Sequence, residues 1–308
     1  MPPHVVVTQP LVGDAIDRLR HAGLDVTVVS EHGPPSRDEL CHALHDASAL
    51  VCLLSDVIDA DVLACGPGLR VVSTVAVGVD NIDLDAARAR GIEVRNTPGV
   101  LDAATADLAM ALLLAVARGV VSGMDAIRRG EWTGFGLATG LGRDLAGMRL
   151  GLVGFGRIAQ RVAARATAFD MRLQHHARHD TGAAGFVADL DELLRTSDAL
   201  SLHVPLTSAT RGLLDARRLA HLPDGAIVIN TARGAVLDER ALVAALVAGH
   251  LGGAGLDVFE DEPNVSASLL AAPNVVLTPH IGSATIETRS AMSSMAVDSV
   301  IDALAGSG

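Results

Sequence analysis

The strongest indication of the fold is the segment Leu150-Gly151-Leu152-Val153-Gly154-Phe155-Gly156-Arg157-Ile158-Ala159. A short apolar strand runs into a G-x-G-x-x-A turn, and a helical pattern follows it. Gly154 permits the tight turn, Gly156 lets the backbone approach a pyrophosphate, and Ala159 lets helix and strand pack closely. The start of the helix adds free N–H groups and the positive end of a dipole. Because a strand and a helix both flank the turn, the segment predicts dinucleotide binding rather than a glycine turn without a ligand.

Short apolar, β-branched runs recur along the whole chain, separated by stretches long enough for one helix each. The candidate strands are Val5–Thr8, Val26–Val29, Leu50–Leu54, Val71–Val75, Ile92–Val94, Leu150–Phe155, Met171–Leu173, Ala199–Val204, Ala226–Asn230, Gly255–Val258 and Val275–Leu277. Their continuous hydrophobicity is typical of parallel strands that helices cover on both faces. The alternation predicts an α/β fold of two doubly wound parallel-sheet, Rossmann-like lobes with a cleft between them.

A breaker cluster, Thr97-Pro98-Gly99, precedes a long helical pattern from Ala103 to about Arg129 and indicates a domain boundary. The last helical stretch of the chain follows the final strand. If it packs back on the first lobe, residues 1–98 and 284–308 form a substrate domain. Residues 99–283 then form the dinucleotide-binding domain.

The composition excludes several classes of function. All 24 basic residues of the 308 are arginine, so Schiff-base, pyridoxal-phosphate and P-loop lysines are excluded. A net charge of −12 argues against non-specific nucleic-acid binding. The longest apolar stretch, Leu108 to Ala117, is too short to span a membrane, and nothing N-terminal resembles a signal peptide. We therefore expect no nucleic-acid partner and no membrane association.

Three cysteines, Cys41, Cys52 and Cys65, are odd in number and form no CxxC spacing. This usage predicts reduced thiols in a reducing compartment and no thiolate metal site. The sequence therefore predicts a soluble cytoplasmic protein.

The end of the second strand of the nucleotide fold bears on cofactor choice. NAD binding places an acidic residue there to bind the ribose hydroxyls. This strand ends instead in Ala177-Arg178-His179, where Arg178 and His179 offer positive charge to a 2′-phosphate. The pattern favours NADPH, with NAD as the second choice because Asp180 follows directly. The histidines of this segment predict a metal site less well, since they lie where the ribose belongs and lack further ligands.

Polar residues follow four strands of the second lobe. The segments are His203-Val204-Pro205, Asn230-Thr231-Ala232-Arg233-Gly234, Asp257 to Pro263, and Thr278-Pro279-His280-Ile281-Gly282. The carboxyl ends of parallel strands converge on the ligand crevice. An arginine, a carboxylate and a histidine there suit a substrate clamp, an orienting group and a proton donor. Taken singly, the acidic residues fit a solvated loop and the histidine an ordinary loop residue; together they favour an active site.

These segments resemble the D-isomer-specific 2-hydroxyacid dehydrogenase family over essentially the whole chain. Further matches are Gly78-Val79-Asp80-Asn81-Ile82-Asp83 and Asn96 to Leu101. The resemblance implies that Arg233, Glu262 and His280 are the catalytic residues. His280 would donate a proton to the carbonyl group during reduction. Glu262 would hydrogen-bond His280 and favour its charged form, and Arg233 would hold the substrate carboxylate.

The resemblance also implies the binding residues. Val77 and Gly78 would offer backbone groups to the substrate carboxylate, and Leu53 would line the substrate pocket. The cofactor residues it implies are Gly154, Gly156, Arg157, Ile158, Arg178, His179, Pro205, Thr210, Thr231, Ala232, Asp257 and Gly282. Asp257 would lie beside the nicotinamide. The resemblance implies no metal.

Within the family, Cys52-Leu53-Leu54-Ser55-Asp56 is similar to the glyoxylate/hydroxypyruvate reductase branch, which commonly uses NADPH. This implies reduction of small 2-oxo acids to D-2-hydroxy acids, and a homodimer formed through Leu101–Arg143. One alternative is a D-3-phosphoglycerate-type dehydrogenase, which the apolar Leu53 disfavours because those enzymes typically carry an arginine there. Another is a dinucleotide-sensing scaffold or corepressor on the same fold, because fold does not fix function.

Overall fold

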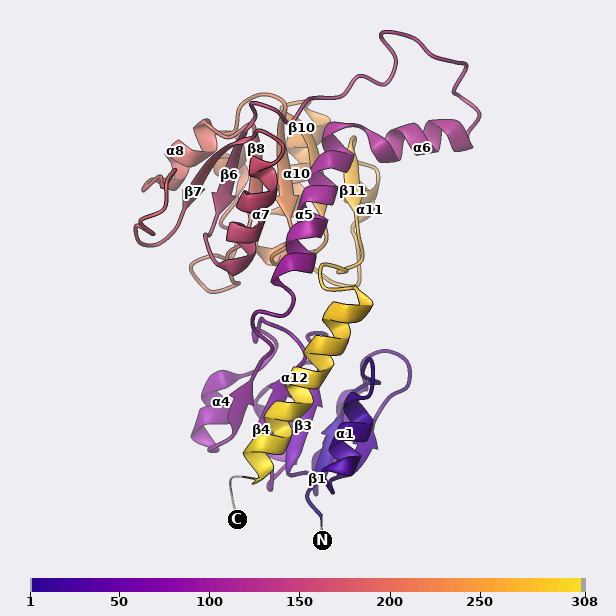
Figure 1. The fold of residues 1–308 in the computed structure, drawn as a ribbon, viewed down its shortest axis with the longest axis vertical. Helices are drawn as coiled ribbons and strands as arrows, with labels where there is room; N and C mark the ends of the chain where they lie inside the picture. The colour runs from indigo at the N-terminus through magenta and orange to yellow at the C-terminus, as the bar shows by residue number, and fades with distance from the viewer. Residues whose placement is uncertain (1, 306–308) are drawn as a thin grey trace. The chain divides into compact units, whose positions relative to one another are not determined.

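Two separate parallel sheets organise residues 2–305, the part of the chain that this computed structural model describes (Figure 1). The chain divides into two units, each with its own core. Unit 1 runs up to Leu101 and resumes at Ser283, and unit 2 is Asp102–Gly282. The predicted α/β class with two helix-covered parallel sheets is confirmed.

Unit 1 is a five-stranded sheet of order β2-β1-β3-β4-β5. Its elements are β1 (His4–Val7), α1 (Ala15–His21), β2 (Asp25–Val28), α2 (Arg37–Leu44), β3 (Ala49–Cys52), α3 (Ala60–Cys65), β4 (Val71–Thr74), α4 (Leu84–Ala89), β5 (Glu93–Arg95) and α12 (Ile286–Ala305). Helices α2, α3 and α4 contribute to one apolar cluster, and α1 and α12 contribute to the other. The C-terminal helix thus completes the core of the first unit.

Unit 2 is a six-stranded sheet of order β11-β10-β9-β8-β6-β7. Its elements are α5 (Asp102–Ala117), α6 (Val120–Arg128), β6 (Arg149–Val153), α7 (Arg157–Thr167), β7 (Arg172–His176), α8 (Leu190–Arg195), β8 (Ala199–Leu202), α9 (Ala216–Leu219), β9 (Ala226–Asn230), a 3₁₀ turn (Gly234–Val236), α10 (Glu239–Val247), β10 (Leu251–Leu256), α11 (Ala267–Leu270) and β11 (Val275–Leu277). Helices α5 and α7 pack in one apolar cluster, and α8 to α11 pack in the other. Strand β6, which leads into the phosphate turn, lies inside this sheet.

Strand β10 starts four residues earlier than the sequence predicts, at Leu251 instead of Gly255. The prediction misses these residues because glycines are uncommon in strands. Helix α5 packs so closely on β10 that side chains do not fit there. A Cβ atom on Gly253 would lie 2.5 Å from Val116 Cγ1, and one on Gly255 would lie 2.8 Å from Leu112 Cβ. The glycines are therefore a packing requirement of this helix–strand contact.

The single long helix expected from Ala103 to Arg129 is wrong. Helix α5 ends at Ala117 and α6 starts at Val120, and the two are bent by 60°. Gly119 lies at the bend with φ +58°, a left-handed conformation that glycine adopts at little cost. Apolar residues continue on both sides of the bend, so the sequence pattern does not reveal it.

The expectation of three reduced cysteines is also wrong. Cys41 and Cys65 form a disulfide with a Cα–Cα distance of 5.1 Å, whereas Cys52 is free and buried. Residues of α2 and α3 share the same apolar cluster, which brings two cysteines 24 residues apart within bonding distance. A tertiary contact of this kind leaves no spacing signal in the sequence. Cysteine usage therefore no longer supports a reducing compartment.

Among residues 2–305, no single helix has both the length and the apolar character of a membrane span. Helices α5 and α6 reach that threshold only when taken together across their bend. Helix α5 buries much of its surface in the core of unit 2.

Candidate active site

The phosphate-binding turn has the geometry that its glycines predict. Gly154 has φ +90°, and a Cβ atom there would lie 2.8 Å from the carbonyl oxygen of His203. Gly156 is the N-cap of α7, and a Cβ atom there would meet nothing within 4 Å. Ala159 is fully buried between the helix and the sheet. The open space beside Gly156 at a helix N-terminus suits a pyrophosphate, which backbone N–H groups would hold.

Arg157, a predicted cofactor residue, has a protein partner. Its Nε lies 3.0 Å from Oδ2 of Asp102, whose side chain is 8% exposed. Asp102 is the first residue of both α5 and unit 2. The next predicted residue, Ile158, is partly buried against the α5–α7 cluster. The phosphate turn therefore offers backbone groups first, and the guanidinium of Arg157 is already engaged with a carboxylate.

The ribose end of the site lies beyond β7. Ala177 is half-buried, and Arg178 and His179 are exposed. Asp180 Oδ1 accepts a hydrogen bond of 2.9 Å from the Gly182 N–H. The carboxylate of Asp180 is thus partly committed to its own turn, and the guanidinium of Arg178 stands at the exposed strand end.

The three histidines of this segment do not gather around a common point. His175 is buried, stacks on Phe155 with ring centroids 3.7 Å apart, and bonds Thr181 Oγ1 through Nε2 at 2.7 Å. His176 bonds the Val187 carbonyl through Nδ1 at 3.1 Å. Burial lowers the pKa of His175. Among the described residues there is no group of three or more His, Cys, Asp or Glu side chains placed to hold a metal ion.

The turns after β8 and β9 hold the next predicted cofactor residues. Thr210 Oγ1 donates to the Pro205 carbonyl at 2.6 Å. The Asn230 side chain accepts from Ala232 N at 3.0 Å and donates to the Arg233 carbonyl at 2.9 Å, which fixes the turn that presents the arginine. Thr231 Oγ1 is buried and makes no hydrogen bond within the protein. Buried hydroxyls are usually satisfied, so this orphaned oxygen fits a site that receives a polar ligand.

Asp257 holds the turn after β11. Its Oδ1 accepts from Thr278 Oγ1 at 2.6 Å and from Ile281 N at 2.7 Å, and its Oδ2 accepts from Gly282 N at 2.7 Å. A Cβ atom on Gly282 would lie 3.1 Å from that Oδ2. The buried carboxylate therefore binds three donors of the Thr278–Gly282 turn, and these bonds fix the position of His280.

His280 and Glu262 form the central pair of the site. His280 Nδ1 lies 2.7 Å from Glu262 Oε2, and Glu262 Oε1 accepts from Phe259 N at 3.0 Å. His280 has φ +52°, a region that non-glycine residues seldom occupy and that is often found at functional sites. Since a carboxylate only accepts hydrogen bonds, Nδ1 carries the hydrogen and Nε2 is left for other chemistry.

The electrostatics of this pair keep Glu262 ionised. Burial alone would raise the pKa of Glu262, but the hydrogen bond and charge of His280 outweigh it, and Arg233 adds a further positive charge. The net result is a lowered pKa for Glu262. On the turn after β8, burial lowers the pKa of His203 to about 4. The site therefore places an ionised Glu262 against the His280 imidazole, and the Arg233 guanidinium favours the charge of that carboxylate.

The three predicted substrate residues of unit 1 lie on two loops, and asparagine side chains donate hydrogen bonds to the main chain of both loops. Leu53 N donates to Asp56 Oδ2 at 2.7 Å, and Asn81 Nδ2 donates to the Leu53 carbonyl at 3.0 Å. The Val77 carbonyl accepts from Asn96 Nδ2 at 2.7 Å. Leu53, Val77 and Gly78 are all half-buried. Asn81 joins the two loops because it belongs to the segment that carries Gly78.

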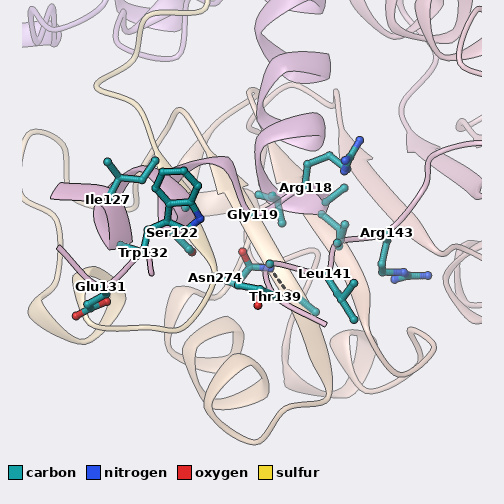
Figure 2. Close-up of a pocket in the computed structure, with 18 of the residues that line it drawn as sticks. Arg118, Gly119, Ser122, Ile127, Glu131, Trp132, Thr139, Leu141, Arg143 and Asn274 are labelled. Atoms are coloured by element: carbon teal, nitrogen blue, oxygen red, sulfur yellow. Dashed lines mark hydrogen bonds between the residues drawn. The ribbon is translucent and has the colours of Figure 1, made fainter. Parts of the chain in front are cut away.

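A hollow of about 750 Å³ lies elsewhere in unit 2, beside α6 (Figure 2). Ile127 and Trp132 line one side of it, and Leu141 and Arg143 line the other. Its described lining includes none of the residues predicted to bind cofactor or substrate. In Figure 1, α6 and the segment after it project from the body of unit 2. This hollow is therefore separate from the candidate active site.

The sequence analysis missed one carboxylate next to the site. Glu239, at the start of α10, is buried and accepts a hydrogen bond from the Glu260 N–H. Burial raises the pKa of Glu239, and the nearby charges of Glu260, Asp261 and Glu262 raise it further. The available signal was an acidic pair, Asp238-Glu239, which follows Gly234 after three apolar residues, but such a pair also fits an ordinary helix start.

Comparisons with known proteins identify the family of this chain. The model of the D-isomer specific 2-hydroxyacid dehydrogenase NAD-binding domain matches residues 110–282. The glyoxylate reductase of Pyrococcus furiosus is 44% identical over 98% of this chain and 92% of its own length. A crystal structure of a Thermus thermophilus protein has a TM-score of 0.94 and 49% identity, covering 98% of this chain and 97% of that one. The NADPH-dependent glyoxylate/hydroxypyruvate reductase of Sinorhizobium meliloti, solved with NADP and malonate, has a TM-score of 0.88 and 33% identity, covering 100% of this chain and 95% of that one. The chain therefore belongs to the D-isomer specific 2-hydroxyacid dehydrogenase family.

Proposed function

We propose that this protein reduces small 2-oxo acids, glyoxylate and hydroxypyruvate, to D-2-hydroxy acids with NADPH as the preferred cofactor. The observation that carries the proposal is the 2.7 Å Glu262–His280 pair with the Arg233 charge beside it, on the same sheet as the phosphate turn. The glyoxylate reductases among its relatives support the substrate class. Leu53 stands where D-3-phosphoglycerate-type dehydrogenases typically carry an arginine. Its apolar side chain offers no charge to a phosphate, which favours an unphosphorylated acid as substrate.

In the proposed reaction, each residue of the site has one task. When bound, a nicotinamide dinucleotide supplies the hydride for the carbonyl carbon. His280 Nε2 delivers a proton to the carbonyl oxygen, and the Glu262 carboxylate stabilises the positive imidazole before transfer. The Arg233 guanidinium holds the substrate carboxylate, for which its planar fork is suited. In unit 1, Val77, Gly78 and Leu53 are the further residues that we propose to bind substrate.

The groups that would hold the cofactor are those of the phosphate turn and of the neighbouring strand ends. Gly154 and Gly156 would admit the pyrophosphate, with Arg157 and Ile158 beginning the helix beneath it. Thr231, Ala232, Pro205 and Thr210 would line the middle, and Asp257 and Gly282 the nicotinamide end. Arg178 and His179 would meet the 2′-phosphate.

The test is a matrix of substrates and cofactors. Glyoxylate, hydroxypyruvate, pyruvate and phosphohydroxypyruvate are each assayed with NADPH and NADH by loss of nicotinamide absorbance. We expect the highest kcat/KM with glyoxylate or hydroxypyruvate and NADPH. Turnover of phosphohydroxypyruvate above all others would replace the proposal with a phosphoglycerate-type activity, and no turnover of any 2-oxo acid would favour a dinucleotide sensor.

A double substitution tests the cofactor preference directly. Ala177→Asp with Arg178→Ile adds a carboxylate for the ribose hydroxyls and removes the cation for the phosphate. Charge-assisted bonds of this kind contribute about 1.5–3 kcal/mol, or roughly tenfold to a hundredfold in affinity. We expect the preference to reverse, mainly through KM for the cofactor, because the ribose is remote from hydride transfer. A wild-type enzyme that already prefers NADH would overturn this part of the proposal.

We also propose that the protein is a homodimer assembled through the region Leu101–Arg143. Phe135 and Leu137 are 89% and 88% exposed, and Ile127 and Trp132 are more than 60% exposed. Apolar side chains gathered at one projecting segment are typical of an interface. Light scattering is expected to give a dimer mass, and Phe135→Asp with Leu137→Asp a monomer. Val247→Asp, at an exposed apolar residue of α10, is the matched control. A monomeric wild type would contradict the proposal.

A cytoplasmic location is proposed as well, because the reaction consumes a reduced dinucleotide. Trapping of the thiol state of Cys41 and Cys65 in intact cells tests it. A disulfide formed in the cell would argue for a more oxidising location.

A further inference from the structure

A buried carboxylate lies behind the Glu262–His280 pair, on a different element. Glu239 opens α10, and its side chain accepts a hydrogen bond from the backbone N–H of Glu260. Asp238, its neighbour, is the N-cap of that helix and accepts from Ala241 N at 2.9 Å. The helix end is therefore capped by Asp238, so the Glu239 carboxylate is not needed there and reaches across to the loop after β10.

The peptide that Glu239 binds is clamped on a second side. A Cβ atom on Gly234 would lie 1.9 Å from the carbonyl carbon of Phe259 and 2.4 Å from Glu260 N. The backbone of Gly234, the residue after Arg233, therefore lies directly against the Phe259–Glu260 peptide. This contact ties the arginine turn to the loop that carries Glu262.

The same peptide leads to the catalytic pair. Phe259 N donates to Glu262 Oε1 at 3.0 Å, and Glu262 Oε2 lies 2.7 Å from His280 Nδ1. A shift of the Phe259–Glu260 peptide would move the donor that holds one oxygen of Glu262. It would then change how the other oxygen meets His280.

We propose that Glu239 is a positioning residue for the proposed reduction: by holding the Glu260 N–H it sets the loop that aims Glu262 at His280. The inference rests on the proposed function. The charges that act on Glu239 are those of Glu260, Asp261 and Glu262, and Glu262 itself is bonded to His280 and influenced by Arg233. A carboxylate facing three others is costly, and burial adds to that cost. The hydrogen bond that Glu239 accepts from the Glu260 N–H is the interaction that offsets the cost of burying this carboxylate.

The experiment compares three variants with wild type in glyoxylate reduction by NADPH. Glu239→Ala removes the acceptor, Glu239→Gln keeps an oxygen acceptor without the charge, and Asp261→Asn removes a charge from the same loop. Misplacing a catalytic group by about 1 Å can cost about a hundredfold in rate. We expect Glu239→Ala to lose about 10- to 100-fold in kcat with a small change in KM, and its alkaline limit of activity to move to lower pH, as in a variant without Glu262. Glu239→Gln should stay within about threefold of wild type, and Asp261→Asn should be unchanged.

The outcomes separate this inference from the proposed function. NADPH binding, followed by fluorescence, and thermal unfolding report whether each variant is folded. If Glu239→Ala binds NADPH normally and keeps the wild-type kcat and pH profile, Glu239 positions nothing. If Glu239→Gln falls as far as Glu239→Ala, the charge and not the hydrogen bond matters, and the inference is wrong. If wild type itself reduces no 2-oxo acid, the proposed function fails first.

Discussion

Both parallel sheets carry polar side chains at their carboxyl ends, but the two ends are bonded differently. In unit 2, Asp257 accepts three hydrogen bonds, and Glu262 is bonded through both oxygens. Six buried side-chain oxygens in residues 2–305 have no hydrogen bond of ordinary geometry, and five of them lie in unit 1: Thr8 Oγ1, Asp56 Oδ1, Ser73 Oγ, Thr74 Oγ1 and Thr97 Oγ1. Of these, Thr8 is close enough to lower the pKa of Asp56, and Thr74 close enough to lower that of Cys52, whereas Ser73 and Thr97 have no such neighbour among the described groups. The sixth belongs to Thr231 in unit 2.

This difference indicates that side chains at the strand ends of unit 2 are held more rigidly than those of unit 1. Networks in which every polar group is satisfied hold their members in one arrangement. The unit 2 end therefore keeps His280 and Glu262 in a fixed geometry, as proton transfer requires. In unit 1, the side-chain amides of Asn81 and Asn96 donate to main-chain carbonyls of the loops, and burial raises the pKa of Asp56. We therefore expect the proposed proton-donor pair of unit 2 to be held more rigidly than the unit 1 loops that carry Leu53, Val77 and Gly78.

The largest expected effect is that of His280→Ala. The variant loses the proton donor but leaves the phosphate turn intact. General acid catalysis contributes about 10²- to 10⁴-fold, so we expect kcat to fall within that range while NADPH binding is unchanged. Steady-state kinetics and NADPH fluorescence titration check the two halves of this expectation. If the variant turns over glyoxylate within a few-fold of the wild-type rate, His280 is not the proton donor.

Arg233→Gln should come next in size. The guanidinium is proposed to bind the substrate carboxylate in the ground state and to stabilise charge that develops on the carbonyl. Loss of both roles should raise KM and lower kcat together. Hydrogen bonds to charged groups contribute about 1.5–3 kcal/mol each, so we expect about a tenfold or larger loss in each constant. An unchanged KM for glyoxylate would mean that the carboxylate binds elsewhere.

Glu262→Gln should change the pH dependence more than the maximal rate. A neutral partner no longer favours the charged imidazole, so the alkaline limb of kcat/KM should move to lower pH. Stability should respond as well. Because the pKa of Glu262 is lowered in the fold, its ionisation stabilises the protein above the ordinary carboxyl range, and this contribution is lost as pH falls through the lowered value. The stability difference from the variant should therefore shrink on acidification. An unmoved pH profile would mean that Glu262 does not act on His280.

The sequence predicts local features well because their signals are local. The phosphate turn needs Gly154 and Gly156 at fixed spacing, and the strand ends that carry Arg233, Glu262 and His280 follow from continuous apolar runs. Features set by tertiary contact were missed. The bend at Gly119, the glycine start of β10, the Cys41–Cys65 pair and the reach of Glu239 all depend on which elements pack together.

The smallest effect, and the most direct test of the comparison, comes from two matched threonine substitutions. Thr278 donates a 2.6 Å hydrogen bond to Asp257 in unit 2, whereas the buried Thr97 hydroxyl in unit 1 makes none. Valine keeps the shape of threonine and removes the hydroxyl. Thr278→Val leaves Asp257 short of a donor and should destabilise by about 1–3 kcal/mol, while Thr97→Val removes an unsatisfied buried group and should be neutral or stabilising by about 1 kcal/mol. Scanning calorimetry of both variants measures the difference. Equal destabilisation would mean that the Thr97 hydroxyl is hydrogen-bonded. The carboxyl ends of the two sheets would then have equally satisfied polar groups.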